Sequence, residues 1–184
     1  MRTLYLFGLA TMFLFMQACG GFGGQGDAEA ADSLTQDLPA VLTTRTTELD
    51  LDDHFFPFTL IVPDSSRGYV EVEDTPYGET IVRVGTVYNM LIAEGGDVAG
   101  KKVELMDDLM FTNTIVEEGD GYFIYKSVIE GSPLDPEFHF YAVKNVNGIE
   151  YEFKDNKDEG PYAESIVRFM LESVQHLTPK QQAS

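Results

Sequence analysis

The sequence has only one cysteine, Cys19, and no tryptophan among its 184 residues. A single cysteine cannot form an intramolecular disulfide, so we expect the fold to depend on its hydrophobic core. The lack of tryptophan argues against a carbohydrate-stacking platform, although tyrosine could replace it. Because 43% of the residues are hydrophobic and 12% are aromatic, the composition still predicts a packed globular domain.

Basic residues are also scarce: 12 Lys and Arg stand against 31 Asp and Glu, and the formal net charge is −19. Such a charge repels the phosphate backbone of nucleic acids and the headgroups of anionic lipids. We therefore expect no nucleic acid partner and no electrostatic attachment to a membrane. The acidity is typical of a solvated surface, and binding of cations or of a basic partner is the alternative.

The N-terminal residues have the pattern of an export signal. A short start that contains Arg2 precedes an apolar stretch over residues 4–16. A helix needs about 20 apolar residues to cross a bilayer, so this stretch is too short to span one and is typical of a signal-peptide core. It ends in the letters MQAC at residues 16–19, which resemble the lipobox of bacterial lipoproteins, although the family prefers leucine where Met16 stands.

The lipobox resemblance implies that residues 1–18 are a cleaved signal peptide and that Cys19 carries a diacylglycerol through a thioether, with an acyl chain on its new amino group. Two or three acyl chains contribute ~0.8 kcal/mol per buried CH₂, which is enough for stable anchoring. The implied location is the bacterial cell envelope, at the outer rather than the inner membrane, with the folded part in the periplasm or at the surface. The alternatives are a secretory signal cleaved elsewhere and an uncleaved anchor.

Residues 19–45 are predicted to be a flexible tether, because they are rich in Gly, Ala and acidic residues. Within them, residues 21–26 match the glycine spacing of a dinucleotide-binding fingerprint. That fingerprint works only between a strand and the start of a helix, and here it follows the lipid attachment site. We therefore expect no nucleotide cofactor, and no cofactor apart from the covalent lipid.

Residues 46–178 are predicted to form one α+β domain, followed by a tail at 179–184. Short strands are expected over the following ranges: 55–63, with prolines typical of a sheet edge, 69–73, 80–84, 87–92, 112–116, 122–130, 137–144 and 149–154. Asn147-Gly148 predicts a tight hairpin turn. One helix is expected over residues 97–109, with Val98, Leu105 and Leu109 on one side. A second helix is expected with Pro161 in its first turn and with a longer apolar stripe. The stripe consists of Tyr162, Ile166, Phe169, Met170, Val174 and Leu177.

This order of elements resembles the Mog1/PsbP-like group of α+β domains, which includes small exported lipoproteins of Bacteroidetes-type bacteria. The resemblance rests on the PFTLIVP strand at residue 57, the GKKVELMDDLMF helix at residue 100, the YFIYKSVIEG strand at residue 122 and the closing helix. It implies a curved antiparallel sheet with two helices packed on it, and a non-enzymatic binding or assembly role without catalytic residues. A cystatin- or NTF2-like fold is the alternative, but those folds begin with their main helix.

Candidate catalytic and metal-binding residues do not form known motifs. The histidines His54, His139 and His176 lack metal-ligand spacing, and His139 is expected to be a structural residue that is half-buried or at the surface. The acidic clusters at residues 50–53 and 155–159 are expected to be solvated loops, because a lysine interrupts the second one where a calcium ligand is needed. The adjacent carboxylates at 107–108 and 117–118 do not suggest a catalytic pair. The serines lack a nucleophile-elbow sequence.

The sequence therefore predicts a lipid-anchored, non-enzymatic accessory factor that binds the membrane through Cys19 and engages an envelope protein. Binding of a small molecule or cation is the alternative, suggested by the acidic loops and by the aromatic residues at 55–58 and 138–141, which are more often core residues. A hydrolase is a residual hypothesis, because catalytic triads assemble in space rather than in sequence.

Overall fold

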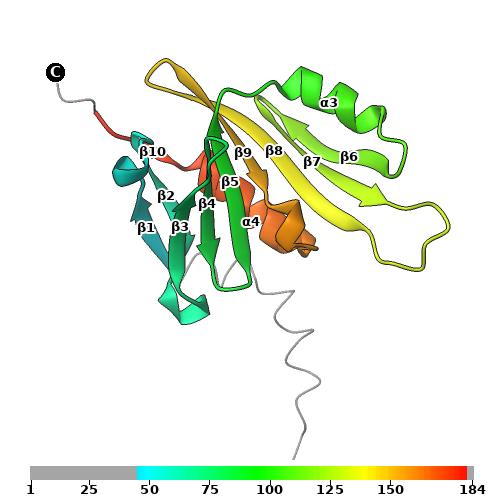
Figure 1. Cartoon of the computed structure of the whole chain (residues 1–184), viewed down its shortest axis with the longest axis horizontal. Coiled ribbons are helices and arrows are strands. Elements are labelled where there is room, and N and C mark those ends of the chain that lie inside the picture. Colours follow the sequence, from blue (N-terminus) through cyan, green and yellow to red (C-terminus); the bar gives the residue numbers. More distant parts are fainter. Residues whose placement is uncertain (1–44, 182–184) are drawn as a thin grey trace, which may run out of the picture.

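The computed structural model describes residues 45–181 (Figure 1). The predicted signal peptide, Cys19 and the tether as far as residue 44 lie outside the described residues. Within those residues, no helix is both long and apolar enough to span a membrane. The elements are β1 (Thr46–Asp50), η1 (Asp52–His54), β2 (Phe58–Pro63), η2 (Ser65–Arg67), β3 (Val70–Asp74), β4 (Glu79–Val84), β5 (Tyr88–Glu94), α3 (Val98–Met106), β6 (Thr112–Gly119), β7 (Tyr122–Val128), β8 (Glu137–Val146), β9 (Ile149–Asp155), η3 (Lys157–Glu159), α4 (Glu164–Gln175) and β10 (Thr178–Pro179).

Seven strands form one antiparallel sheet in the order β3-β4-β5-β9-β8-β7-β6, and β1, β2 and β10 form a second sheet. Together with the two α-helices, these sheets confirm the predicted α+β class. The prediction that β2 is an edge strand is wrong, since β2 lies between β1 and β10. Its prolines are tolerated there because Pro63 ends the strand, while Pro57 precedes it and accepts the N–H of Lys180 through its carbonyl.

The main core lies between one face of the large sheet and a layer made of α4 and the small sheet (Figure 1). Alternate strand residues point into it, as expected for strands with one face towards the core. Burial of each large apolar side chain contributes about 1.5–3 kcal/mol. The fully buried members with the largest side chains include Tyr88, Phe58, Phe153, Leu60, Met90, Ile92, Ile124 and Met170.

Helix α4 buries most of its predicted apolar stripe in this core, including Phe169, Met170 and Val174. It begins at Glu164, with Ala163 as N-cap, so the prediction that Pro161 occupies its first turn is wrong. The residue between them, Tyr162, instead forms an extended bridge with Phe138, and this bridge delays the start of the helix.

The opposite face of the large sheet is covered in part by α3, above a small aromatic cluster. Leu105 is the one buried residue of α3, and it packs against Phe123, Tyr125 and Tyr141. The Asp97 side chain caps the helix by accepting the N–H of Gly100 at 3.0 Å.

Helix α3 ends at Met106, and Leu109 is fully exposed, so the predicted helix end and the predicted position of Leu109 on its apolar side are wrong. The reason is local. The Asp108 carboxylate accepts the N–H groups of Met110 and Phe111, at 2.8 and 3.0 Å, and holds the chain in a turn.

The β8–β9 hairpin forms at the predicted residues. Asn147 and Gly148 have φ angles of 55° and 90°, the left-handed values that this tight turn requires. Strand β8 extends to Val146, past the residues that pair with β7, and this extension shapes the site described next.

Candidate functional site

His139 and Asp155 form a buried pair where β8 meets the end of β9. The His139 Nδ1 lies 2.7 Å from the Asp155 Oδ2, and the Asp155 Oδ1 accepts the N–H of Phe140 at 2.8 Å. The side chains of both residues are almost completely buried, with the imidazole ring centroid 5.1 Å from that of Tyr125. The prediction of a surface or half-buried His139 is therefore wrong, and so is a solvated position for Asp155. Each needs the other as a hydrogen-bonding partner because both are removed from water.

The other two histidines lie elsewhere in the fold. The His54 Nδ1 is 3.0 Å from the Asp74 carboxylate, and His176 is the exposed C-cap of α4. In the part of the chain that the structure describes, no group of three or more His, Cys, Asp or Glu side chains could hold a metal ion.

The adjacent carboxylates also point to separate partners. Glu117 pairs with Arg168 of α4, whereas Glu118 accepts a hydrogen bond from Lys102 of α3 at 2.8 Å, so the two side chains lie on opposite faces of the sheet. Asp108 holds the turn after α3, where hydrogen bonds from the Phe111 and Met110 N–H groups lower the pKa of its carboxyl. These side chains therefore stabilise the local fold, and the geometry does not bring them together as a pair.

The aromatic residues near the start of the domain are mainly core residues. Phe56 and Phe58 are buried and pack against Tyr151, with ring centroids 5.6 and 5.3 Å from the tyrosine ring. Phe140 is also buried, whereas Phe55 is 90% exposed. The core interpretation is thus confirmed for Phe56, Phe58 and Phe140, and Phe140 also contributes with Tyr141 to the wall of the inner cleft described next.

An inner cleft of about 330 Å³ lies between α3 and the sheet, beside the aromatic cluster. The Lys154 ammonium on its wall lies 2.9 Å from Glu79 and 2.8 Å from Glu152. Lys157 places its ammonium 5.1 Å from the centre of the Tyr125 ring, a cation–π distance. Burial raises the pKa of Tyr125 and lowers that of Lys157. The cleft could hold a small polar molecule, although its walls already contain paired charges.

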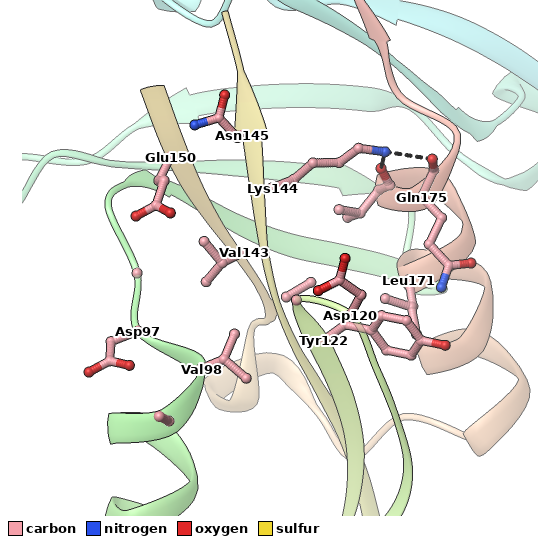
Figure 2. Close-up of a pocket in the computed structure, with 15 residues that line it drawn as sticks. Asp97, Val98, Asp120, Tyr122, Val143, Lys144, Asn145, Glu150, Leu171 and Gln175 are labelled. Carbon is pink, nitrogen blue, oxygen red and sulfur yellow. Dashed lines mark hydrogen bonds between the residues drawn. The ribbon is translucent and has the colours of Figure 1, made fainter. Parts of the chain in front are cut away.

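A larger hollow of about 660 Å³ lies between the N-terminus of α3 and the C-terminus of α4 (Figure 2). We call it the α3–α4 hollow. Strand β8 runs along it and contributes Val143, Lys144 and Asn145. The Lys144 ammonium donates hydrogen bonds to the carbonyls of Val174 and Gln175, at 3.0 and 2.6 Å, and so caps the end of α4. Burial lowers the pKa of Lys144.

A group of exposed apolar side chains, which we call the distal patch, lies at the end of the sheet where α3 ends. The segments that carry it are neighbours, because Thr112 pairs with Val128 and its hydroxyl donates to Glu130 at 3.3 Å. Figure 1 shows the turn after α3 and the β7–β8 loop at this same end. The patch consists of Val103, Met106, Leu109, Met110, Ile129 and Leu134.

The distal patch holds six of the ten large hydrophobic side chains found exposed in residues 45–181. Leu109 is completely exposed, and Met106, Met110 and Leu134 each expose more than 70% of their surface. Exposed apolar residues scattered singly are ordinary, whereas large exposed apolar patches occur at protein–protein and membrane interaction sites and at ligand-binding grooves.

Neither the distal patch nor the hollow was predicted from the sequence. The letters LMDDLM at residues 105–110 contain a signal that could have indicated the patch, since apolar residues there flank two adjacent aspartates. Such a segment cannot bury all its apolar residues without also burying a carboxylate. The hollow had no comparable signal, because its residues come from five helices and strands and from two loops.

Comparison of the chain with protein-family models, with curated proteins and with solved structures found no match.

Proposed function

We propose that this protein is a lipid-anchored, non-enzymatic accessory factor of the bacterial cell envelope, whose Mog1/PsbP-like domain binds a partner protein through the distal patch. The observation that carries the proposal is the concentration of exposed Leu and Met side chains at one end of the domain. Met-rich surfaces are adaptable and recur at protein-binding sites. The anchor rests on the lipobox at residues 16–19 and on Cys19 as the lipid-bearing residue.

The charge around the distal patch indicates the chemistry of the partner. The exposed carboxylates of Glu104, Asp107, Asp108, Glu130 and Asp135 flank the apolar residues. A bilayer with anionic lipids is disfavoured as the occupant, because these carboxylates repel its headgroups. A second copy of the chain is disfavoured because two acidic rims would face each other. The partner that fits is a protein surface with apolar residues ringed by Lys and Arg.

The test is in-cell crosslinking of the tagged full-length protein, followed by mass spectrometry. The double variant Leu109→Ser/Met110→Ser removes two adjacent, strongly exposed apolar side chains of the patch. Tyr77→Ser is the control, because Tyr77 is 90% exposed on the β3–β4 turn. We expect one envelope protein to be recovered with the wild type and with the control and to be lost with the double variant. Equal recovery with all three forms would refute the patch as the docking surface.

The anchor has a separate test in the variant Cys19→Ser. We expect this change to stop lipid attachment and to release the protein from the membrane fraction, or to stop its processing. An unchanged mass and an unchanged membrane fraction would contradict the lipoprotein assignment. The result does not depend on the distal patch, so the two parts of the proposal fail separately.

Small-molecule binding in the inner cleft is the second candidate function. It is favoured by the Lys157 ammonium, for which no carboxylate lies within ion-pair distance among the described residues, and by the adjacent buried Tyr125 ring. A thermal-shift screen of the purified protein against metal ions and envelope metabolites tests it. A ligand that raises the melting temperature of the wild type but not of Lys157→Ala would support this function, and a screen without any shift would reject it.

A further inference from the structure

Strand β8 has an open edge next to the α3–α4 hollow. Its pairing with β7 ends where Tyr122 faces Ala142, and the last contact on that side is the Val143 N–H, which donates to the Gly121 carbonyl at 2.8 Å. Beyond this point, within residues 45–181, β8 is paired only with β9, as far as Val146. The β6–β7 turn therefore leaves the last residues of β8 without a neighbouring strand on one side among the described residues.

The direction of the free backbone groups follows from the register. Asn145 faces Glu150 in the β8–β9 pair, and the Glu150 carbonyl accepts the N–H of Gly95 at 2.7 Å, on the far side of β9. In an antiparallel pair, the backbone N–H and C=O groups of two facing residues either bond to each other or both point away from the partner strand. Asn145 therefore directs its backbone N–H and carbonyl away from β9, towards the open edge.

The hollow beside this edge has an apolar wall and an acidic rim. Figure 2 shows Val98 of α3, Val143 of β8 and Leu171 of α4 around it. An extended chain rises about 3.3 Å per residue, so a short extended segment could lie along β8 within the hollow. The apolar side chains would contact alternate residues of such a segment.

Charge selects the kind of segment. Asp97, Asp120 and Glu150 line the hollow, and all three retain exposed surface. Lys144 is the one basic residue that lines the hollow in the described part of the chain. Its ammonium already donates hydrogen bonds to two carbonyls at the end of α4. The field in the hollow is therefore negative and favours Lys and Arg side chains.

We infer that the α3–α4 hollow binds an extended, basic peptide segment of another protein, which adds as a strand to the open edge of β8 at Asn145. Strand addition of this kind takes its affinity from main-chain hydrogen bonds and its specificity from alternate side chains. The N-terminal segment of this chain does not fit as the occupant, because residues 19–44 include four acidic residues but no Lys or Arg. The inference goes beyond the proposed function and requires neither the lipid anchor nor the distal patch.

The test uses the full-length protein in detergent and a fluorescein-labelled peptide of sequence Lys-Val-Lys-Val-Lys, followed by fluorescence anisotropy. We expect saturable binding, and about tenfold weaker binding to the double variant Asp120→Lys/Glu150→Lys. The charge-matched control is Glu48→Lys/Glu73→Lys, which reverses two exposed carboxylates on β1 and β3 and should bind as the wild type does. A Glu-Val-Glu-Val-Glu peptide should not bind.

Backbone recognition has its own control. In an extended Lys-Val-Lys-Val-Lys peptide, the N–H groups of the valines point to one edge and those of the lysines to the other. N-methylation of the valines therefore removes the donors of the first edge, and N-methylation of the lysines removes those of the second. If the peptide adds to β8, one of these two peptides should bind about tenfold more weakly than the other.

Three results would overturn the inference: no saturable binding, equal losses in the hollow and control variants, or equal affinity of the two N-methylated peptides. Leu109→Ser/Met110→Ser should bind the peptide normally, so a failure here is distinguishable from a failure of the distal patch.

Discussion

The two faces of the large sheet differ in how they are covered. One face packs against α4 and the small sheet and contains most of the buried apolar residues, whereas the other carries the nine-residue α3, which buries only Leu105. The inner cleft, the α3–α4 hollow and the distal patch all include residues of α3 or of the loops at its ends. The comparison indicates that stability comes from the α4 face and that the α3 side is available for binding.

The largest expected loss of stability tests this difference between the two faces of the sheet. Phe153→Ala, on the α4 face, should lower the free energy of unfolding by about 3–5 kcal/mol, because it leaves a cavity in a fully buried core. Leu105→Ala, under α3, should cost about 2 kcal/mol, at the low end for such a change, because a short helix can settle into the gap. Urea denaturation of the two variants measures both losses, and equal values would contradict this difference.

The buried His139–Asp155 pair should be an exception on the α3 face. Asp155→Ala leaves the Phe140 N–H and the His139 ring without their acceptor in a buried site, and should cost about 2–3 kcal/mol. Asp158→Ala is the matched control, an exposed carboxylate in the same segment, and should change stability by about 0.5 kcal/mol or less. If denaturation shows similar losses for both, the pair has no special role in stability.

A smaller effect is expected where the two faces meet at the end of α4. Lys144→Met removes the donors to the Val174 and Gln175 carbonyls and should cost about 1 kcal/mol. Lys126→Met is the control, since Lys126 is a partly buried lysine on β7 for which the described residues provide no ion pair. A melting-temperature difference between these two variants checks the prediction, and identical melting would show that the cap contributes nothing.

The last prediction concerns local motion rather than overall stability. The amides of α3 should exchange with deuterium on the order of tenfold or more faster than those of α4, because α3 is held by one buried residue and α4 by six. Hydrogen exchange of the full-length protein, read by mass spectrometry, provides the measurement. Comparable protection of both helices would show that α3 is a rigid part of the fold.

Local patterns predicted the elements well wherever one residue type dictates the backbone or one face is uniformly apolar. Asn147-Gly148 set the β8–β9 hairpin, and the apolar stripe of α4 identified its buried side. Two predictions failed because distant partners decided the outcome: β2 has neighbours on both edges, and His139 pairs with Asp155 of the neighbouring strand. A third failed for a local reason, since the hydrogen bonds from the Met110 and Phe111 N–H groups to Asp108 form a turn that ends α3 early.

The candidate sites were even less accessible to sequence reasoning. The free backbone groups of Asn145 depend on where β7 stops relative to β8, and that register is set by the β6–β7 turn. Residues such as Asp97, Asp120 and Glu150 are far apart in the chain, and each of them alone is typical of a solvated surface. Only the fold brings their charges together.

The position of β1 has a mechanical consequence. The chain that leads back to Cys19 joins the described domain at the start of β1, whose five residues pair with β2, and β2 is backed on its other edge by β10. The Lys180 ammonium after β10 adds ion pairs to Asp50 and Asp52 at 2.5 Å. In a protein anchored at Cys19, a pulling force from a bound partner would therefore act first on the hydrogen bonds between β1 and β2. The small sheet would then transmit the tension between the membrane and the rest of the domain.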